Sequence, residues 1–99
     1  MGSVGANNSI FTKINTINFV ESQTAYNTPI FTADIPGVGK GAYWQNTQNT
    51  RWDIVIGKYV NGTKLELVDT PNPVSSSATR QGAETLVRNW LRAIANGDV

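Results

Sequence analysis

The sequence predicts an α+β fold, in which an antiparallel sheet of four to five strands is followed by one C-terminal amphipathic helix packed on a sheet. Three observations predict this class. The chain has 99 residues, which is the length of a single domain with one core. Residues 51–60 alternate apolar and polar side chains ahead of an Asn-Gly turn signal. Residues 78–95 repeat apolar side chains at helical spacing.

The N-terminal part predicts an arm and then a strand. Residues 1–9 are small and polar, so we expect a flexible arm, with the single α+β domain covering 10–99. Ile10–Val20 is rich in β-branched and aromatic side chains, which favours a strand. Its apolar side chains change parity midway, and a bulge near Asn15 would reconcile the two halves.

A second strand and a polar connection follow. Residues 22–28 predict a turn, and Ile30–Ile35 predicts a strand that pairs with the first in a hairpin. The glycine-rich segment 36–41 ends that strand. We expect 42–44 to form a brief edge strand and the polar residues 45–50 to form a loop.

The clearest pattern is a hairpin centred on Asn61-Gly62, the dipeptide that suits a type I′ turn because both central residues need a positive φ. A two-residue loop would place Val60 opposite Thr63, and therefore Ile56 opposite Leu67. The predicted apolar face of this hairpin then consists of Trp52, Ile54, Ile56, Leu65 and Leu67.

The last element is predicted to be a helix over 78–95. Ser77 is the expected N-cap, and Asn96-Gly97 supplies a C-terminal stop. Its apolar stripe requires a sheet to cover it, in its own chain or in a neighbour's. The stripe consists of Ala83, Leu86, Val87, Trp90, Leu91 and Ile94.

Composition excludes several kinds of chemistry. The chain has no cysteine and no histidine, which removes thiol nucleophiles, imidazole acid–base catalysis and Cys- or His-based zinc sites. The carboxylates show no paired motif, and Gly37–Gly41 lacks the following helix that a phosphate-binding loop needs. We therefore expect a protein that is not an enzyme and uses no cofactor or metal.

Charge and hydropathy limit the classes of partner that the sequence favours. A net charge of +1 gives no global attraction to nucleic acid or to an anionic membrane. No apolar run approaches a membrane span, and the first residues lack the pattern of a signal peptide. Asn and Thr are abundant whereas charged residues make up 15%, a bias that favours a β-rich, assembly-forming domain.

Two groups of residues are candidate contact sites. Tyr59 and Lys64 are predicted to lie opposite each other on the exposed hairpin face, where an aromatic ring beside a cation could stack a base of RNA, with Lys58 as a further cation. The alternative is an ordinary cross-strand pair. Trp90, Leu91 and Ile94 are expected to form an interface if the sheet is too small to cover them.

Several segments carry a resemblance to a known family. They are Pro36-Gly37 followed by Gly41-Ala42-Tyr43-Trp44, the long hairpin over 51–69 and the helix that ends in Ala93-Ile94-Ala95-Asn96-Gly97. With these, the stretch 17–95 resembles the coat proteins of single-stranded RNA phages. That family has a further hairpin before the helix and a second helix after it, and this chain is shorter. The resemblance implies self-association into homodimers and shells, RNA binding on the sheet face, and a location in the virion or the cytoplasm of a bacterial host.

Three functions follow as expectations. The first is a non-enzymatic assembly or interaction protein, coat-like in form, that makes homo-oligomers and contacts RNA or a protein partner. The second is a small nucleic-acid-binding domain with a sheet followed by a helix. The third is a phage-encoded inhibitor that binds a host protein.

Overall fold

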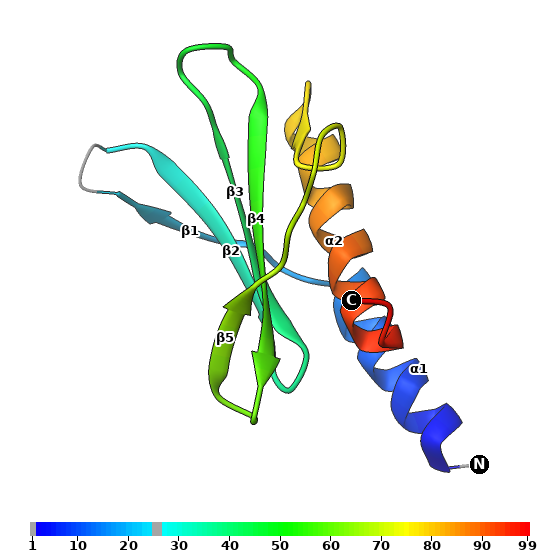
Figure 1. The fold of residues 1–99 in the computed structure, drawn as a ribbon. Coiled ribbons are helices and arrows are strands. Elements are labelled where there is room, and N and C mark those ends of the chain that lie inside the picture. Colours follow the sequence, from blue (N-terminus) through cyan, green and yellow to red (C-terminus); the bar gives the residue numbers. More distant parts are fainter. Residues whose placement is uncertain (1, 25–26) are drawn as a thin grey trace.

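The α+β fold predicted from the sequence is confirmed (Figure 1). A computed structural model describes residues 2–24 and 27–99, with side chains from Ser9 onward. Its elements are α1 (Gly2–Asn15), β1 (Val20–Gln23), β2 (Pro29–Ile35), β3 (Gly39–Gln45), β4 (Trp52–Val60), β5 (Lys64–Leu67), β6 (Ser76–Ser77) and α2 (Arg80–Asn96). Among the residues so described, no helix is long and apolar enough to cross a membrane.

The sheet is an antiparallel meander in which β1 to β5 lie side by side in chain order. The short strand β6 pairs with β4 on the edge that β5 also uses, at the opposite end of β4. Both helices lie on one side of the sheet, with α2 packed on β3, β4 and β6, and α1 packed beside α2 (Figure 1). The other side of the sheet is covered by none of the described elements.

The predicted strand over Ile10–Val20 is wrong, because residues 2–15 form helix α1 and only Val20 belongs to strand β1. Residues 2–9, expected to form an arm, are the first part of this helix. The apolar positions Ile10, Phe11 and Ile14 have helical spacing, and Ile14 is completely buried in the core. The change of parity attributed to a bulge is therefore a helical period, and tertiary burial overrides the strand propensity of β-branched residues.

The glycine-rich segment 36–41 is a turn only over its first half, and its second half belongs to the sheet. Only residues 36–38 form the turn, where Gly37 has a φ of 77°, and β3 begins at Gly39. The predicted edge strand is therefore a central strand, paired with β2 on one side and β4 on the other. A Cβ atom at Gly41 would lie 2.5 Å from Cγ1 of Val87, so glycine here lets α2 approach the sheet.

The predicted register of the long hairpin is wrong by one residue. Asn61 and Gly62 do have positive φ values of 53° and 84°, but Thr63 also belongs to the loop, so Val60 pairs with Lys64. A shift of one residue moves every side chain of the strand to the other face. Leu65 and Leu67 therefore lie on the face opposite to Ile54 and Ile56. Helix α2 packs on β3, β4 and β6, so it offers the leucines of β5 little to pack against.

Helix α2 begins two residues later than predicted. Its N-cap is Thr79, whose Oγ1 accepts the backbone N–H of Gly82 at 3.0 Å, and not Ser77. Ser77 pairs with Trp52 as part of β6, which keeps its backbone extended. The predicted stop is confirmed, because Gly97 has a φ of 80° and its N–H reaches the carbonyl groups of the last turn.

The core lies between the helices and one face of the sheet. Ala83, Val87 and Leu91 of α2 are fully buried against it. The sheet contributes alternate side chains from its three central strands. These are Phe31, Ala33, Ile35, Tyr43, Ile54 and Ile56.

Candidate functional site

The uncovered side of the sheet, here called the helix-free face, is the main candidate surface. Side chains along a strand alternate between faces, so the pairing registers define its members. They are Val20 and Ser22 from β1, Ile30, Thr32 and Asp34 from β2, Lys40, Ala42 and Trp44 from β3, Asp53, Val55, Gly57 and Tyr59 from β4, and Leu65 and Leu67 from β5.

This face exposes large apolar side chains. Leu67 is 78% exposed, Val20 65%, Leu65 44% and Val55 38%. Single exposed apolar residues are normal, but here four of them share one face with Ala42 and Trp44. Val55, Leu65 and Leu67 gather around Ala42, whereas Val20 lies on the other edge strand, beyond Thr32. Exposed apolar groups of this kind are typical of a site that binds another protein.

A hollow of about 200 Å³ lies within this face. Gly57 forms its floor, because a glycine in the middle of a strand leaves a gap between the neighbouring side chains. The other residues that line it are Lys40, Gly41, Ala42, Val55, Leu65 and Leu67. Its wall is therefore aliphatic apart from the Lys40 ammonium group.

The charged side chains of the helix-free face are Asp34, Lys40 and Asp53. The Tyr59 hydroxyl donates a hydrogen bond to Asp34 Oδ1 at 2.7 Å, and this bond raises the pKa of Tyr59. Asn46 Nδ2 donates to Asp53 Oδ2 at 3.2 Å. Both carboxylates are thus tied to neighbours at the margins of the face, and one cation stands next to the hollow.

The structure does not bring the predicted RNA-binding residues together. Tyr59 pairs with Leu65, whereas Lys64 pairs with Val60 and Lys58 with Glu66. The alternation of strand β4 therefore puts Tyr59 on one face and the two lysines on the other. The expected ring beside a cation is absent, and its cause is the same one-residue shift of the hairpin register.

The predicted interface residues of the helix lie against the chain's own sheet. Leu91 is completely buried in the core, and Trp90 and Ile94 are half-buried at its margin. The indole Nε1–H of Trp90 donates to the backbone carbonyl of Val74 at 3.2 Å. The apolar stripe of α2 is thus largely used within the protein.

A second group of interacting side chains surrounds Tyr43 on the helix-covered face. The Tyr43 hydroxyl donates to Glu84 Oε2 at 2.6 Å and accepts from Arg80 Nε at 3.0 Å. Burial, reinforced by the bond to Glu84, raises the pKa of Tyr43 to about 12. The Arg80 guanidinium also lies 4.0 Å from the centre of the Phe31 ring. These contacts join the first two turns of α2 to the sheet.

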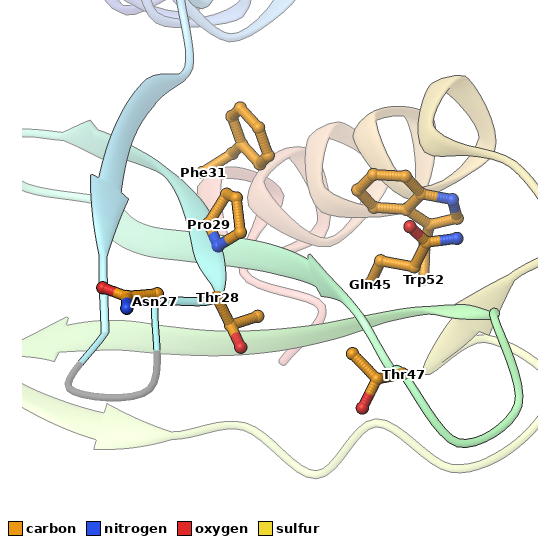
Figure 2. A pocket seen from close by; sticks show the side chains of 7 residues that line it. All are labelled: Asn27, Thr28, Pro29, Phe31, Gln45, Thr47 and Trp52. Atoms are coloured by element: carbon orange, nitrogen blue, oxygen red, sulfur yellow. The ribbon is translucent and has the colours of Figure 1, made fainter.

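A pocket of about 360 Å³ lies beyond this group, where the sheet extends past α2. Figure 2 shows Phe31 and Pro29 of β2 on one side, with Trp52 and Gln45 on the other. Asn27, Thr28 and Thr47 complete the lining, which contains no charged side chain. The pocket can accommodate a small apolar group, but its lining offers no acid, base or nucleophile of unusual reactivity. Within residues 2–24 and 27–99, no group of three acidic side chains could hold a metal ion.

The exposed leucines of β5 were not predicted, because a two-residue turn would place them in the core. One signal was available, since Gly57 interrupts an otherwise bulky strand and a glycine there indicates a gap in one face. Comparisons with known proteins add no further constraint: no family model, no curated protein and no solved structure matches this chain.

Proposed function

We propose that this protein is a non-enzymatic assembly or interaction protein that self-associates through the helix-free face of its sheet. The observation that carries the proposal is the group of apolar side chains exposed there, led by Leu67 and Val20. Removing apolar surface from water is the main driving force of protein association. One face of this sheet is covered by α2 and the other has an apolar surface with no cover from the described elements.

A coat-like structural subunit is the form of this proposal that the sequence resemblance favours. Self-association is the part that the exposed face supports. RNA binding on the same face has weaker support, because phosphate groups are bound mainly by cations and Lys40 is the one cation that strand alternation places there. The proposal therefore concerns protein–protein contact first.

Size-exclusion chromatography with light scattering tests the proposal on the full chain. We expect a molar mass that rises with concentration from that of the 10.7 kDa monomer. Absorbance at two wavelengths would distinguish protein assemblies from particles that carry nucleic acid, and megadalton particles of the second kind would support the coat-like form. A monomer at every concentration reached would contradict self-association and direct the search to a different protein partner.

A further inference from the structure

We propose that the partner of the helix-free face is a second copy of this chain, bound so that Leu67 of each copy enters the hollow over Gly57 of the other. This inference rests on the proposed function and specifies its contact. A two-fold symmetric interface uses the same patch on both chains, so the patch must be complementary to itself, and a protruding group beside a matching recess meets that condition.

Leu67 is the protruding group. It is the last residue of β5, the strand at one edge of the sheet (Figure 1), and it is 78% exposed. It is the most exposed of the large apolar side chains among the described residues. The structure thus presents a branched aliphatic group that its own chain leaves largely uncovered.

Gly57 forms the recess. It pairs directly with Leu67, so the protruding side chain and the hollow lie next to each other on adjacent strands. Leu65 leans over the hollow from the side, since a Cβ atom at Gly57 would lie 3.3 Å from Leu65 Cδ2. The remaining wall, from Ala42 and Val55, is aliphatic and therefore suits a leucine side chain.

The protruding Leu67 and the recess over Gly57 lie next to each other on the same face. This arrangement favours a second copy of the chain over an unrelated partner. A two-fold axis that lies in the plane between the two copies, parallel to the strands and midway between β4 and β5, would place each Leu67 over the other chain's Gly57. Charge is consistent with this arrangement, because the face carries both Lys40 and the acidic Asp34 and Asp53. A copy of the same face therefore brings groups of both signs, whereas a nucleic acid brings negative charge alone.

The size of the face sets the expected strength. Five strands about 4.8 Å apart and about 20 Å long give a flat surface of roughly 400 Å², below the roughly 800 Å² of accessible surface that each partner buries in a standard interface. We therefore expect a reversible dimer whose population depends on concentration. Its central contact, and not its area, would provide most of the affinity.

The first experiment compares Leu67→Asp with Val99→Asp by sedimentation velocity over a range of protein concentrations. Leu67→Asp places one carboxylate in each of the two recesses, so we expect the dimer dissociation constant to rise at least about 100-fold. Val99 is also an exposed aliphatic residue, at 40%, but it lies at the C-terminus and outside the face. Val99→Asp should dimerise like the unchanged protein.

The second experiment changes the recess over Gly57 instead of the protruding Leu67. Gly57→Ala would add a methyl group to the floor of the hollow and weaken dimerisation roughly tenfold, an effect of about 1.4 kcal/mol. Circular dichroism of both variants would show whether the fold is retained. Loss of dimerisation in a folded Gly57→Ala variant cannot come from a missing Leu67 side chain, so it tests the other half of the contact.

A crosslink tests the geometry directly. The chain contains no cysteine, so introduced thiols react only with each other. Leu67→Cys mixed with Ala42→Cys should form a disulfide between copies when an oxidant is added. Thr85→Cys, on the exposed side of α2, should not crosslink with Leu67→Cys under the same conditions.

The outcomes separate this inference from the proposed function. If the unchanged protein associates and Leu67→Asp associates equally well, the contact between Leu67 and the recess over Gly57 is wrong, whereas self-association is retained. Association without the disulfide between Leu67→Cys and Ala42→Cys would also overturn the contact. If the unchanged protein is monomeric throughout, both proposals fail.

Discussion

The two faces of the sheet are built from the same strands, yet the apolar side chains of one face are buried and those of the other are exposed. On β4, Ile56 is completely buried beneath α2, whereas its neighbour Val55 is 38% exposed on the helix-free face. Both faces carry aliphatic side chains, but the helices cover only one of them. The difference teaches that the hydrophobic pattern of a strand identifies which residues seek burial, and not which of them the same chain will bury.

This contrast has a simple physical origin. A sheet needs one covered face to form a core, and α2 supplies enough apolar surface for one face only. An apolar second face adds much less to the stability of the monomer, mainly through cross-strand pairs, and remains available to a partner.

The largest effect should come from adjacent residues on β4. Ile56→Ala should lower the free energy of unfolding by about 2–5 kcal/mol, because it leaves a cavity in the core. Val55→Ala, on the other face, should cost about 1 kcal/mol or less, mainly through strand propensity. Urea unfolding at concentrations where the protein is monomeric measures both. Equal losses would show that the helix-free face is buried within the monomer.

The next comparison uses two glycines on opposite faces. Gly41→Ala should cost about 1–3 kcal/mol, because its Cβ would meet Val87 Cγ1 at 2.5 Å and push α2 from the sheet. Gly57→Ala should cost the monomer less, since the nearest atom to its methyl group is the movable end of Leu65 at 3.3 Å, and the Glu66 carbonyl oxygen at 3.7 Å is an ordinary contact. The same unfolding measurement applies. A neutral Gly41→Ala variant would contradict the close approach of α2.

The covering helix also depends on its N-terminal cap. Thr79→Ala should lower stability by about 1 kcal/mol, because the N–H of Gly82 loses its acceptor. Ser77→Ala serves as the comparison and should cost less, since its Oγ accepts a longer bond of 3.2 Å from the N–H of Thr79. Thermal unfolding of the two variants would rank them. The reverse ranking would identify Ser77, and not Thr79, as the N-cap of α2.

The smallest effect concerns the tyrosines of the two faces at alkaline pH. The pKa of Tyr43 is about 12 in the folded protein against 10 in an unfolded chain, so folding favours the neutral hydroxyl. That contribution is complete below pH 10 and is lost as the pH rises toward about 12. Stability should therefore decline over this interval in the unchanged protein and less in Tyr43→Phe.

An ultraviolet difference titration checks the same assignment. The signal missing in Tyr43→Phe should be the one that titrates at about pH 12. On the helix-free face, Asp34→Asn should lower the pKa of Tyr59, because the bond to the Asp34 carboxylate is the main cause of its rise. If Tyr43 titrated near its ordinary value of 10, the burial of its hydroxyl would be disproved.

Much of the fold follows from local patterns. The strand over Ile30–Ile35, the strand over 52–60 and the C-terminal helix were predictable because alternation, helical spacing and the Gly97 stop all act over a few residues. The N-terminal helix was not predicted, because its β-branched residues favour a strand. In the folded protein the helix buries Ile14 in the core. Propensity and burial conflict there, and burial decides.

The candidate surface was less predictable than the fold. The sequence placed Tyr59 beside Lys64 and the leucines of β5 in the core, and one additional loop residue, Thr63, reversed both assignments. A strand register depends on the whole hairpin and on what covers each face, so a dipeptide such as Asn61-Gly62 indicates the turn but not the pairing.

By itself the sequence determined the class of fold, the positions of the main strands and the helix, and the absence of thiol and imidazole chemistry. Those properties depend on residue identity or on spacing within one element. Only the tertiary structure decided which face of the sheet the helices cover, and hence that Leu67 is exposed beside Gly57. Faces and neighbours are set by contacts between distant segments, which local periodicity does not encode.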